Sequence, residues 1–198
     1  MQPFHAHTGV VAPLPRPDID TDQIIPKQFL KRLGRTGFAD ALFYDWRGDG
    51  ATGSQRDFVL NDPRYASASV LVAGPNFGCG SSREHAVWAL HDYGFRVVLA
   101  PSFADIFASN AVANGFLAVR IDEATVESIV AAATDRPGSA LTVDLEAMRV
   151  TGPGGLDAPI VVDERARARL LEGLDDIALI LRHEDAIRRY EAAHSGAL

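Results

Sequence analysis

The sequence contains a single cysteine, Cys79, so an intramolecular disulfide framework is excluded. Its first residues lack the charged and then apolar pattern of a secretory signal, and no apolar run approaches the ~18 residues that span a membrane. Basic residues are also few, 19 Lys and Arg against 26 Asp and Glu, which argues against a general nucleic-acid binder. We therefore expect a soluble, cytoplasmic protein without a membrane or nucleic-acid partner.

The length and composition are those of one globular domain. With 198 residues, of which 47% are hydrophobic and 23% charged, the chain can bury a sizeable core. No internal repeat or linker divides it, so we predict a single domain over residues 1–198. The net charge of −7 says little about small acidic substrates, because one arginine can create a local positive site.

The central feature is a strand–loop–helix unit at residues 69–93. Residues 69–73 (SVLVA) are apolar and rich in β-branched side chains, which predicts a buried strand. Apolar residues recur at helical spacing over residues 86–93, which predicts a helix with one buried face. A glycine-rich loop joins the two. In open α/β sheets, ligands bind at such turns, where a strand ends.

The chemistry of this loop indicates an anion site. Ser81 followed by Glu84 fits a capping box, which predicts that the helix begins at Ser81 or Ser82. Arg83 places a cation in the first turn, where the helix dipole disfavours it. We interpret Arg83 as held there to meet an anion, and its planar fork suits a carboxylate. The alternative is an ordinary capping serine beside a solvent-exposed arginine.

Familiar loop motifs do not match this stretch. The pair Gly78-x-Gly80 is followed by Arg83 where a dinucleotide fingerprint has glycine, and no Gly-Lys-Ser/Thr is present to bind a triphosphate. Gly80 occupies the place of the serine in a hydrolase elbow. Cys79 as a nucleophile needs a base and an orienting group, which the sequence does not reveal.

Strands and helices alternate along the second half of the chain, which predicts an α/β fold with parallel strands and right-handed crossovers. Residues 1–17 are expected to form an edge strand or an extended arm. The predicted strands are residues 96–100 and 116–121, with a β-hairpin at 140–145 and 148–151. The predicted helices are residues 102–114 (capped by Ser102), 123–134, 163–173 and a C-terminal helix over 174–194.

Three alternating aspartates, Asp18, Asp20 and Asp22, precede an apolar segment. A calcium loop of the EF-hand type requires glycine at its sixth position and glutamate at its twelfth, and these places hold Gln23 and Phe29. The calcium interpretation therefore fails, and no metal site is predicted. Carboxylates in this pattern start turns and cap the following segment.

Residues 34–64 are rich in glycine and aspartate, with scattered aromatic side chains. So long an irregular stretch in a compact domain is usually functional or mobile. We therefore predict a mobile or interface loop at 34–64, in which the aromatic residues act as interface anchors. The alternative is that they fill the core of this domain.

Four stretches resemble one family in the right order along nearly the whole chain. NFGCGSSREHA (76–86) and DIDTDQIIPKQFLK (18–31) are similar to the two signatures of the swivelling domain of the aconitase superfamily. TGFADALFYDWR (36–47) and LDDIALILRHEDAIRRYE (174–191) resemble one branch of it, the small subunits of bacterial isopropylmalate dehydratases.

The resemblance implies an aconitase-type swivelling domain, with β/β/α layers, crossover helices between parallel strands and additional antiparallel strands. It also implies a heteromeric hydro-lyase of leucine biosynthesis, which converts 2-isopropylmalate to 3-isopropylmalate through 2-isopropylmaleate. Aconitase-type [4Fe–4S] clusters need several thiolates, and this chain has one cysteine. The cluster is therefore expected on a larger partner subunit, with no cofactor in this chain.

The resemblance also implies the site residues, position by position. Ser81 matches the base that removes the proton, and Ser82 and Arg83 match residues that bind substrate oxygens. Thr21 and Asp22 match an element that borders the active site, and they are expected to bind substrate as part of its wall. Lys31 lies roughly where relatives have an arginine that meets a carboxylate. Because the alignment can slip there, Lys27 and Arg32 remain alternatives.

Two other functions stay open from the sequence. One is the small subunit of a related hydro-lyase acting on citraconate, dimethylmalate or homoaconitate. Residues 29–32 would decide that choice, since they are expected to contact the variable part of the substrate. The other is an anion-binding module that uses Arg83 and the helix end without chemistry.

Overall fold

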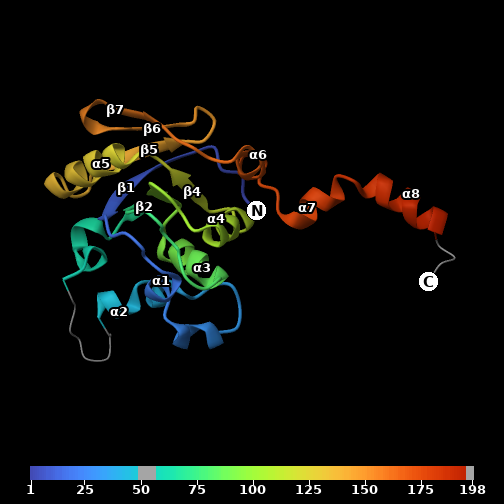
Figure 1. The fold of residues 1–198 in the computed structure, drawn as a ribbon, viewed down its shortest axis with the longest axis horizontal. Helices are drawn as coiled ribbons and strands as arrows, with labels where there is room; N and C mark the ends of the chain where they lie inside the picture. Colours follow the sequence, from blue (N-terminus) through green and yellow to red (C-terminus); the bar gives the residue numbers. More distant parts are fainter. Residues whose placement is uncertain (49–56, 195–198) are drawn as a thin grey trace.

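Figure 1 shows the computed structural model, which describes residues 1–48 and 57–194. Over these residues, seven strands form one mixed sheet in the order β4-β3-β2-β1-β5-β6-β7. Strands β1 to β4 pair in parallel, and β5 to β7 continue the sheet in antiparallel fashion. Their bounds are β1 Ala6–Leu14, β2 Ala68–Ala73, β3 Val97–Ala100, β4 Leu117–Arg120, β5 Ala140–Asp144, β6 Arg149–Gly152 and β7 Leu156–Pro159.

Helices cover both faces of the parallel part of the sheet (Figure 1). The α-helices are α1 Thr21–Ile24, α2 Tyr44–Arg47, α3 Glu84–Tyr93, α4 Asp105–Ala113, α5 Glu123–Asp135, α6 Glu164–Glu172, α7 Asp176–Leu181 and α8 Glu184–His194. Short 3-10 turns lie at Lys27–Lys31, Ala39–Ala41, Val59–Asn61, Pro63–Tyr65 and Pro153–Gly155. Among the described helices, none is both long and apolar enough to cross a bilayer.

Two apolar cores form because successive strand residues point to opposite faces of the sheet. On β2, Leu71 and Ala73 belong to the core under α3 and α4, whereas Val70 and Val72 belong to the core under α5. The first core is rich in phenylalanine and also includes residues of α1 and its flanking turns. The segments around α1 and α3 therefore pack into the same apolar core.

The predicted α/β class, with crossover helices between parallel strands and additional antiparallel strands, is confirmed, with four local corrections. The N-terminal segment is the central strand β1, between β2 and β5, and not an edge strand or an arm. Ser102 does not cap α4; its Oγ accepts a hydrogen bond of 2.8 Å from the main-chain N–H of Asn76. Strand β7 was not predicted, and the C-terminal helix is divided into α7 and α8.

The aromatic residues of the predicted loop at 34–64 divide into two groups. Phe38, Phe43 and Phe58 are buried in the core, so the core-filling alternative holds for these three. Tyr44 and Trp46 are half-buried at its margin. The predicted mobility concerns residues that include 49–56, which lie outside the described residues.

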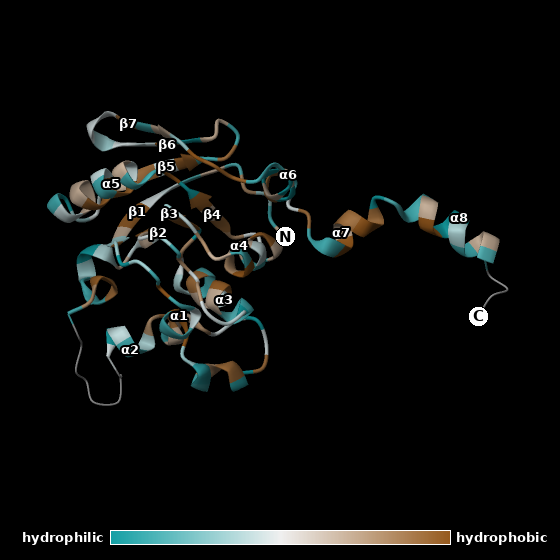
Figure 2. Ribbon diagram, in the orientation of Figure 1, coloured by the Kyte–Doolittle hydropathy of each residue, from teal (hydrophilic) through white to brown (hydrophobic). Residues whose placement is uncertain are grey.

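Helices α7 and α8 extend away from the body as a C-terminal arm (Figure 1). The arm is joined to α6 by ion pairs of Asp176 with Arg169 and of Arg182 with Glu172. Figure 2 shows apolar residues concentrated on α7. The exposed large apolar side chains of the arm are Ile177, Ile180, Leu181, Ile187 and Tyr190.

Gly78 fixes the path of the loop after β2. Its φ is +77°, and an added Cβ would lie 2.3 Å from Cγ of Phe107, which packs edge-on against Phe77. Gly78→Ala should lower the free energy of unfolding by about 2–5 kcal/mol, because left-handed strain adds to overpacking. Urea denaturation measures this loss.

Gly138→Ala is the matched control for this substitution. Gly138 has φ +88°, and a Cβ there would meet nothing within 4 Å, so only the conformational strain of about 1–2 kcal/mol applies. Equal losses in the two variants would contradict the close packing of Gly78 against Phe107.

Candidate active site

Two loops meet where the adjacent parallel strands β1 and β2 end. Main-chain hydrogen bonds join them along their length: Asp18 N to Pro75 O at 2.9 Å, Gly78 N to Ile19 O at 2.7 Å, and Thr21 N to Cys79 O at 2.9 Å. The carboxyl ends of parallel strands are where ligands bind in open α/β sheets. The two segments that carry the predicted site residues are thus neighbours in space.

Side chains reinforce this pairing of loops. Asn76 donates from Nδ2 to Asp18 at 2.7 Å, and Thr21 donates from its hydroxyl to the Ser81 carbonyl oxygen at 2.8 Å. The Arg83 guanidinium forms an ion pair with Asp22. Four predicted site residues, Thr21, Asp22, Ser81 and Arg83, are therefore in direct contact pairwise across the two loops.

Ser81 and Ser82 are exposed and lie before α3, which begins at Glu84 with Arg83 as its N-cap. The predicted capping box is therefore wrong, since no side chain caps this helix end. Among the described residues, no hydrogen bond uses the main-chain N–H groups of residues 80–83. These amides and the positive end of α3 remain available to an anion beside the Ser81 hydroxyl.

Arg83 is largely enclosed, with 14% of its side chain exposed. Its Nη1 donates a hydrogen bond to Asp22 and lies 3.5 Å from the Ile25 carbonyl oxygen. Within the described chain, Nε and Nη2 have no hydrogen-bond partner. The Asp22 contact holds the guanidinium in place and leaves one two-donor edge that matches a carboxylate.

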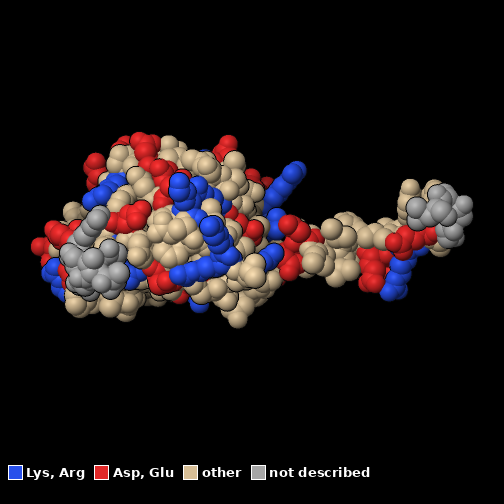
Figure 3. Space-filling view, turned by 90° about the horizontal axis from the view of Figure 1, so that it is seen from below, with Lys and Arg blue, Asp and Glu red and all other residues tan. Residues whose placement is uncertain are grey.

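The three basic candidates at 27–32 differ in their contacts. Arg32 is bound by both carboxylate oxygens of Asp40, at 2.6 and 2.7 Å, and lies over the Phe29 ring. Lys27 and Lys31 are exposed in their 3-10 turn and have no ion pair with another described residue. Figure 3 shows Lys and Arg side chains grouped on this lower face of the body. Among the described residues, no hydrogen bond or ion pair joins Lys31 to the Ser81 loop.

Asp20 is the N-cap of α1 and forms a complete capping box with Gln23. The interpretation of the aspartates as turn and cap residues is thus confirmed for Asp20. Burial and the neighbouring carboxylates of Asp20 and Asp18 raise the pKa of the Cys79 thiol, which disfavours the thiolate needed for nucleophilic or metal-binding roles.

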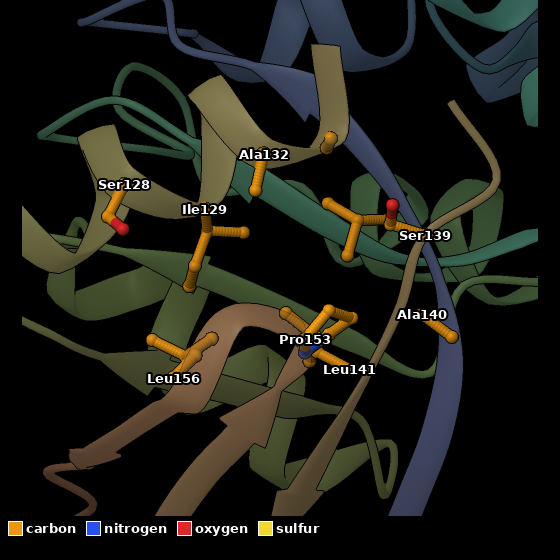
Figure 4. A pocket seen from close by; sticks show the side chains of 10 residues that line it. Ser128, Ile129, Ala132, Ser139, Ala140, Leu141, Pro153 and Leu156 are labelled. Atoms are coloured by element: carbon orange, nitrogen blue, oxygen red, sulfur yellow. The ribbon is translucent and has the colours of Figure 1, made fainter. Parts of the chain in front are cut away.

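An apolar cleft of about 40 Å³ lies elsewhere, between α5 and the segments after it (Figure 4). Ile129 and Ala132 of α5 face Leu141 and Leu156 across it. It belongs to the α5 side of the sheet, whereas the loop of Ser81 joins the core under α3. The exposed Ser81 loop therefore lies apart from this cleft.

Comparison with known proteins agrees with this arrangement. The model of the aconitase C-terminal domain matches residues 1–124, and that of the C-terminal domain of the 3-isopropylmalate dehydratase small subunit matches residues 176–197. A crystal structure of 3-isopropylmalate dehydratase from Methanocaldococcus jannaschii shares the fold, with a TM-score of 0.66 and 24% identity, covering 93% of this chain and 99% of that one.

Curated relatives match over essentially their full length. The 3-isopropylmalate dehydratase small subunit of Koribacter versatilis is 57% identical, over 98% of this chain and all of the relative. That of Frankia alni is 55% identical, over 97% of this chain and 95% of the relative. That of Brevibacillus brevis is 53% identical, over 97% and 99%.

The paired loops and the sheet thus define a domain of the aconitase C-terminal class. Within this class, the chain belongs to the family of 3-isopropylmalate dehydratase small subunits. The resemblance read from the sequence is confirmed. Sequence reasoning missed the hydrogen bond from Thr21 to Ser81 and the Asn76–Asp18 contact, which join residues far apart in the chain.

Proposed function

We propose that this chain supplies the proton-transfer and carboxylate-binding half of an isopropylmalate dehydratase. The reaction removes a proton from one carbon of 2-isopropylmalate and hydroxide from its neighbour, giving 2-isopropylmaleate and water. Water then adds to the same double bond with the two carbons exchanged: the hydroxyl goes to the carbon that lost the proton, and the proton goes to the carbon that lost the hydroxyl, which gives 3-isopropylmalate. The observation that carries this proposal is the contact of the Thr21–Asp22 loop with the Ser81–Arg83 loop.

Ser81 is the proposed base, and its environment has to favour an alkoxide. A helix end contributes only about 0.3–2 kcal/mol, and one pKa unit corresponds to about 1.4 kcal/mol. One hydrogen-bond donor directed at an oxyanion in a site without water contributes about 2.7–4 kcal/mol. The free amides of residues 80–83 are therefore a larger source of stabilisation than the helix dipole.

Arg83 is the proposed carboxylate anchor. Its Nε and Nη2 edge can bind both oxygens of one substrate carboxylate while Asp22 holds Nη1. Ser82, adjacent to Ser81 and exposed, is placed to donate to another substrate oxygen. Lys31 and Lys27 are the basic candidates for a second carboxylate, since Arg32 is already bound by Asp40.

The side chains of this protein do not fit an iron–sulfur cluster. The chain has one cysteine, and its described part contains no cluster of three or more His, Cys, Asp or Glu side chains able to hold a metal ion. We place the [4Fe–4S] cluster on the larger partner subunit, where it would act as a Lewis acid on the substrate hydroxyl.

Small-subunit relatives imply a larger partner, and two features support a heteromer. Ser81 and Ser82 are open to solvent, so a second surface has to exclude water from them. The C-terminal arm also exposes a series of large apolar side chains, which is typical of a surface that contacts another protein. We propose a heterodimer or a higher heteromer.

The isolated chain should be inert, because the Lewis acid and the second wall of the site come from the partner. The test compares this chain, the large subunit and their mixture, with absorbance reporting the unsaturated intermediate from 2-isopropylmalate. We expect turnover only in the mixture. Sustained dehydration by this chain alone would refute the division of labour, and citraconate hydration without isopropylmalate turnover would refute the substrate.

A further inference from the structure

We infer that Thr21 is a positioning residue whose hydroxyl holds the Ser81–Ser82 peptide in the orientation that proton transfer requires. This inference rests on the proposed role of Ser81. It differs from the expectation that Thr21 binds substrate, because the hydroxyl of Thr21 is directed at the protein itself. Its donor group is already used by the Ser81 carbonyl oxygen, at 2.8 Å.

Thr21 is unusually well fixed for a polar residue. It is 2% exposed and is the one buried polar or charged residue of the described chain. Its main-chain N–H donates to Cys79 O at 2.9 Å, and its carbonyl oxygen accepts from Ile25 N at 3.0 Å. The Asp20 capping box fixes the turn from which Thr21 extends. The position of the Thr21 hydroxyl is therefore fixed by the surrounding protein, and it can hold the group that it contacts in one orientation.

The segment that Thr21 contacts has little other support. The hydrogen bond from Thr21 is the only one that joins Gly80, Ser81 or Ser82 to any described residue. No helix or strand contains these three residues, because α3 begins only at Glu84. Gly80 has φ +87°, and a Cβ there would lie 3.6 Å from Thr21 Oγ1, so the loop passes close above the threonine.

The planarity of the peptide makes this one bond sufficient to set the orientation. The Ser81 carbonyl and the Ser82 N–H belong to one rigid trans peptide and point in opposite directions. When Thr21 holds the carbonyl oxygen inward, the Ser82 N–H is turned away from Thr21. No described residue accepts a hydrogen bond from this N–H. An error of 1 Å in the position of a catalytic group can cost about 100-fold in rate.

The experiment compares Thr21→Val, which keeps the shape and removes the donor, with Thr21→Ser, which keeps the donor, in the reconstituted complex. Thr21→Val should lower kcat by about 10-fold or more with KM changed less than about twofold, since position and not substrate contact is lost. Thr21→Ser should retain kcat within about threefold. Thr8→Val, which removes the exposed hydrogen bond between Thr8 of β1 and Thr142 of β5, is the control and should leave both constants unchanged.

A double variant separates this inference from the proposed function. If Thr21 acts through Ser81, adding Thr21→Val to Ser81→Ala should reduce kcat no further. Normal kcat in Thr21→Val, or equal damage in Thr21→Ser and Thr21→Val with the complex assembled, would overturn the positioning role. Should Thr21→Val fail to assemble, Thr21→Ser decides: kcat within about threefold of normal supports the role of the donor, and a larger loss of kcat in an assembled Thr21→Ser complex overturns it. Normal activity of Ser81→Ala itself would instead remove the proposed base.

Discussion

Ser81→Ala should lower the turnover of the reconstituted complex by about 10²–10⁴-fold, the range expected when a general base is lost. The substitution removes one exposed oxygen that takes part in no hydrogen bond of the described chain, so stability and assembly should be unaffected. The main-chain amides and Arg83 remain, and they should keep substrate binding close to normal. Steady-state kinetics with 2-isopropylmalate, together with size-exclusion chromatography of the complex, measures both effects.

Ser128→Ala is the matched control, because Ser128 is also exposed but lies on α5, on the other side of the sheet. It should be fully active. A Ser81→Ala complex with more than about a third of normal turnover would exclude Ser81 as the base, since general-base losses are far larger.

Arg83→Lys should raise KM and lower kcat/KM by about 10–100-fold, because lysine cannot provide the two parallel donors that bind a carboxylate. The charge is retained, and the Asp22 partner is still within reach of a flexible ammonium group. Turnover at saturating substrate should therefore fall less than kcat/KM does. Initial rates over a range of 2-isopropylmalate concentrations give this division.

The control for Arg83 is Arg64→Lys, since Arg64 makes a comparable contact with Asp62 in a separate 3-10 turn at Pro63–Tyr65. We expect its kinetic constants to equal those of the unaltered complex. An unchanged KM in Arg83→Lys would contradict carboxylate binding by the guanidinium fork.

Local patterns predicted the strand–loop–helix unit well. The apolar run at 69–73 and the helical spacing after residue 84 are both signals that lie within a few neighbouring residues of the sequence. The same local reasoning placed the start of α3 too early. Ser81 and Glu84 have capping-box spacing, yet the Ser81 carbonyl is held by Thr21 and no serine caps the helix. A contact with a residue far away in sequence therefore overrides the capping preference.

The position of β1 and the burial of the aromatic residues at 34–64 also depend on contacts between distant segments, which local sequence patterns do not predict. Prolines and polar residues near the N-terminus suggested an edge, but the segment pairs on both sides, with β2 and with β5. Phe38 and Phe43 lie in irregular sequence, yet they complete the core under α3. Periodicity alone does not show which irregular segments fold back onto the sheet.

The candidate site needed both kinds of information. Loop composition indicated an anion site at Arg83, and the family resemblance added Thr21 and Asp22 as neighbours. Only the structure shows how they are connected: Asp22 restrains the guanidinium, and Thr21 restrains the serine. Those bonds span loops after different strands, so spacing along the chain does not reveal them.

The most direct test is a structure of the assembled heteromer, with both of its subunits present and isopropylmalate bound. We predict that Ser81 Oγ lies about 3–3.5 Å from the carbon that loses its proton, with Arg83 on a substrate carboxylate. A heteromer in which another side chain occupies that position, and Ser81 lies more than about 6 Å away, would contradict the account, because proton transfer requires hydrogen-bond reach.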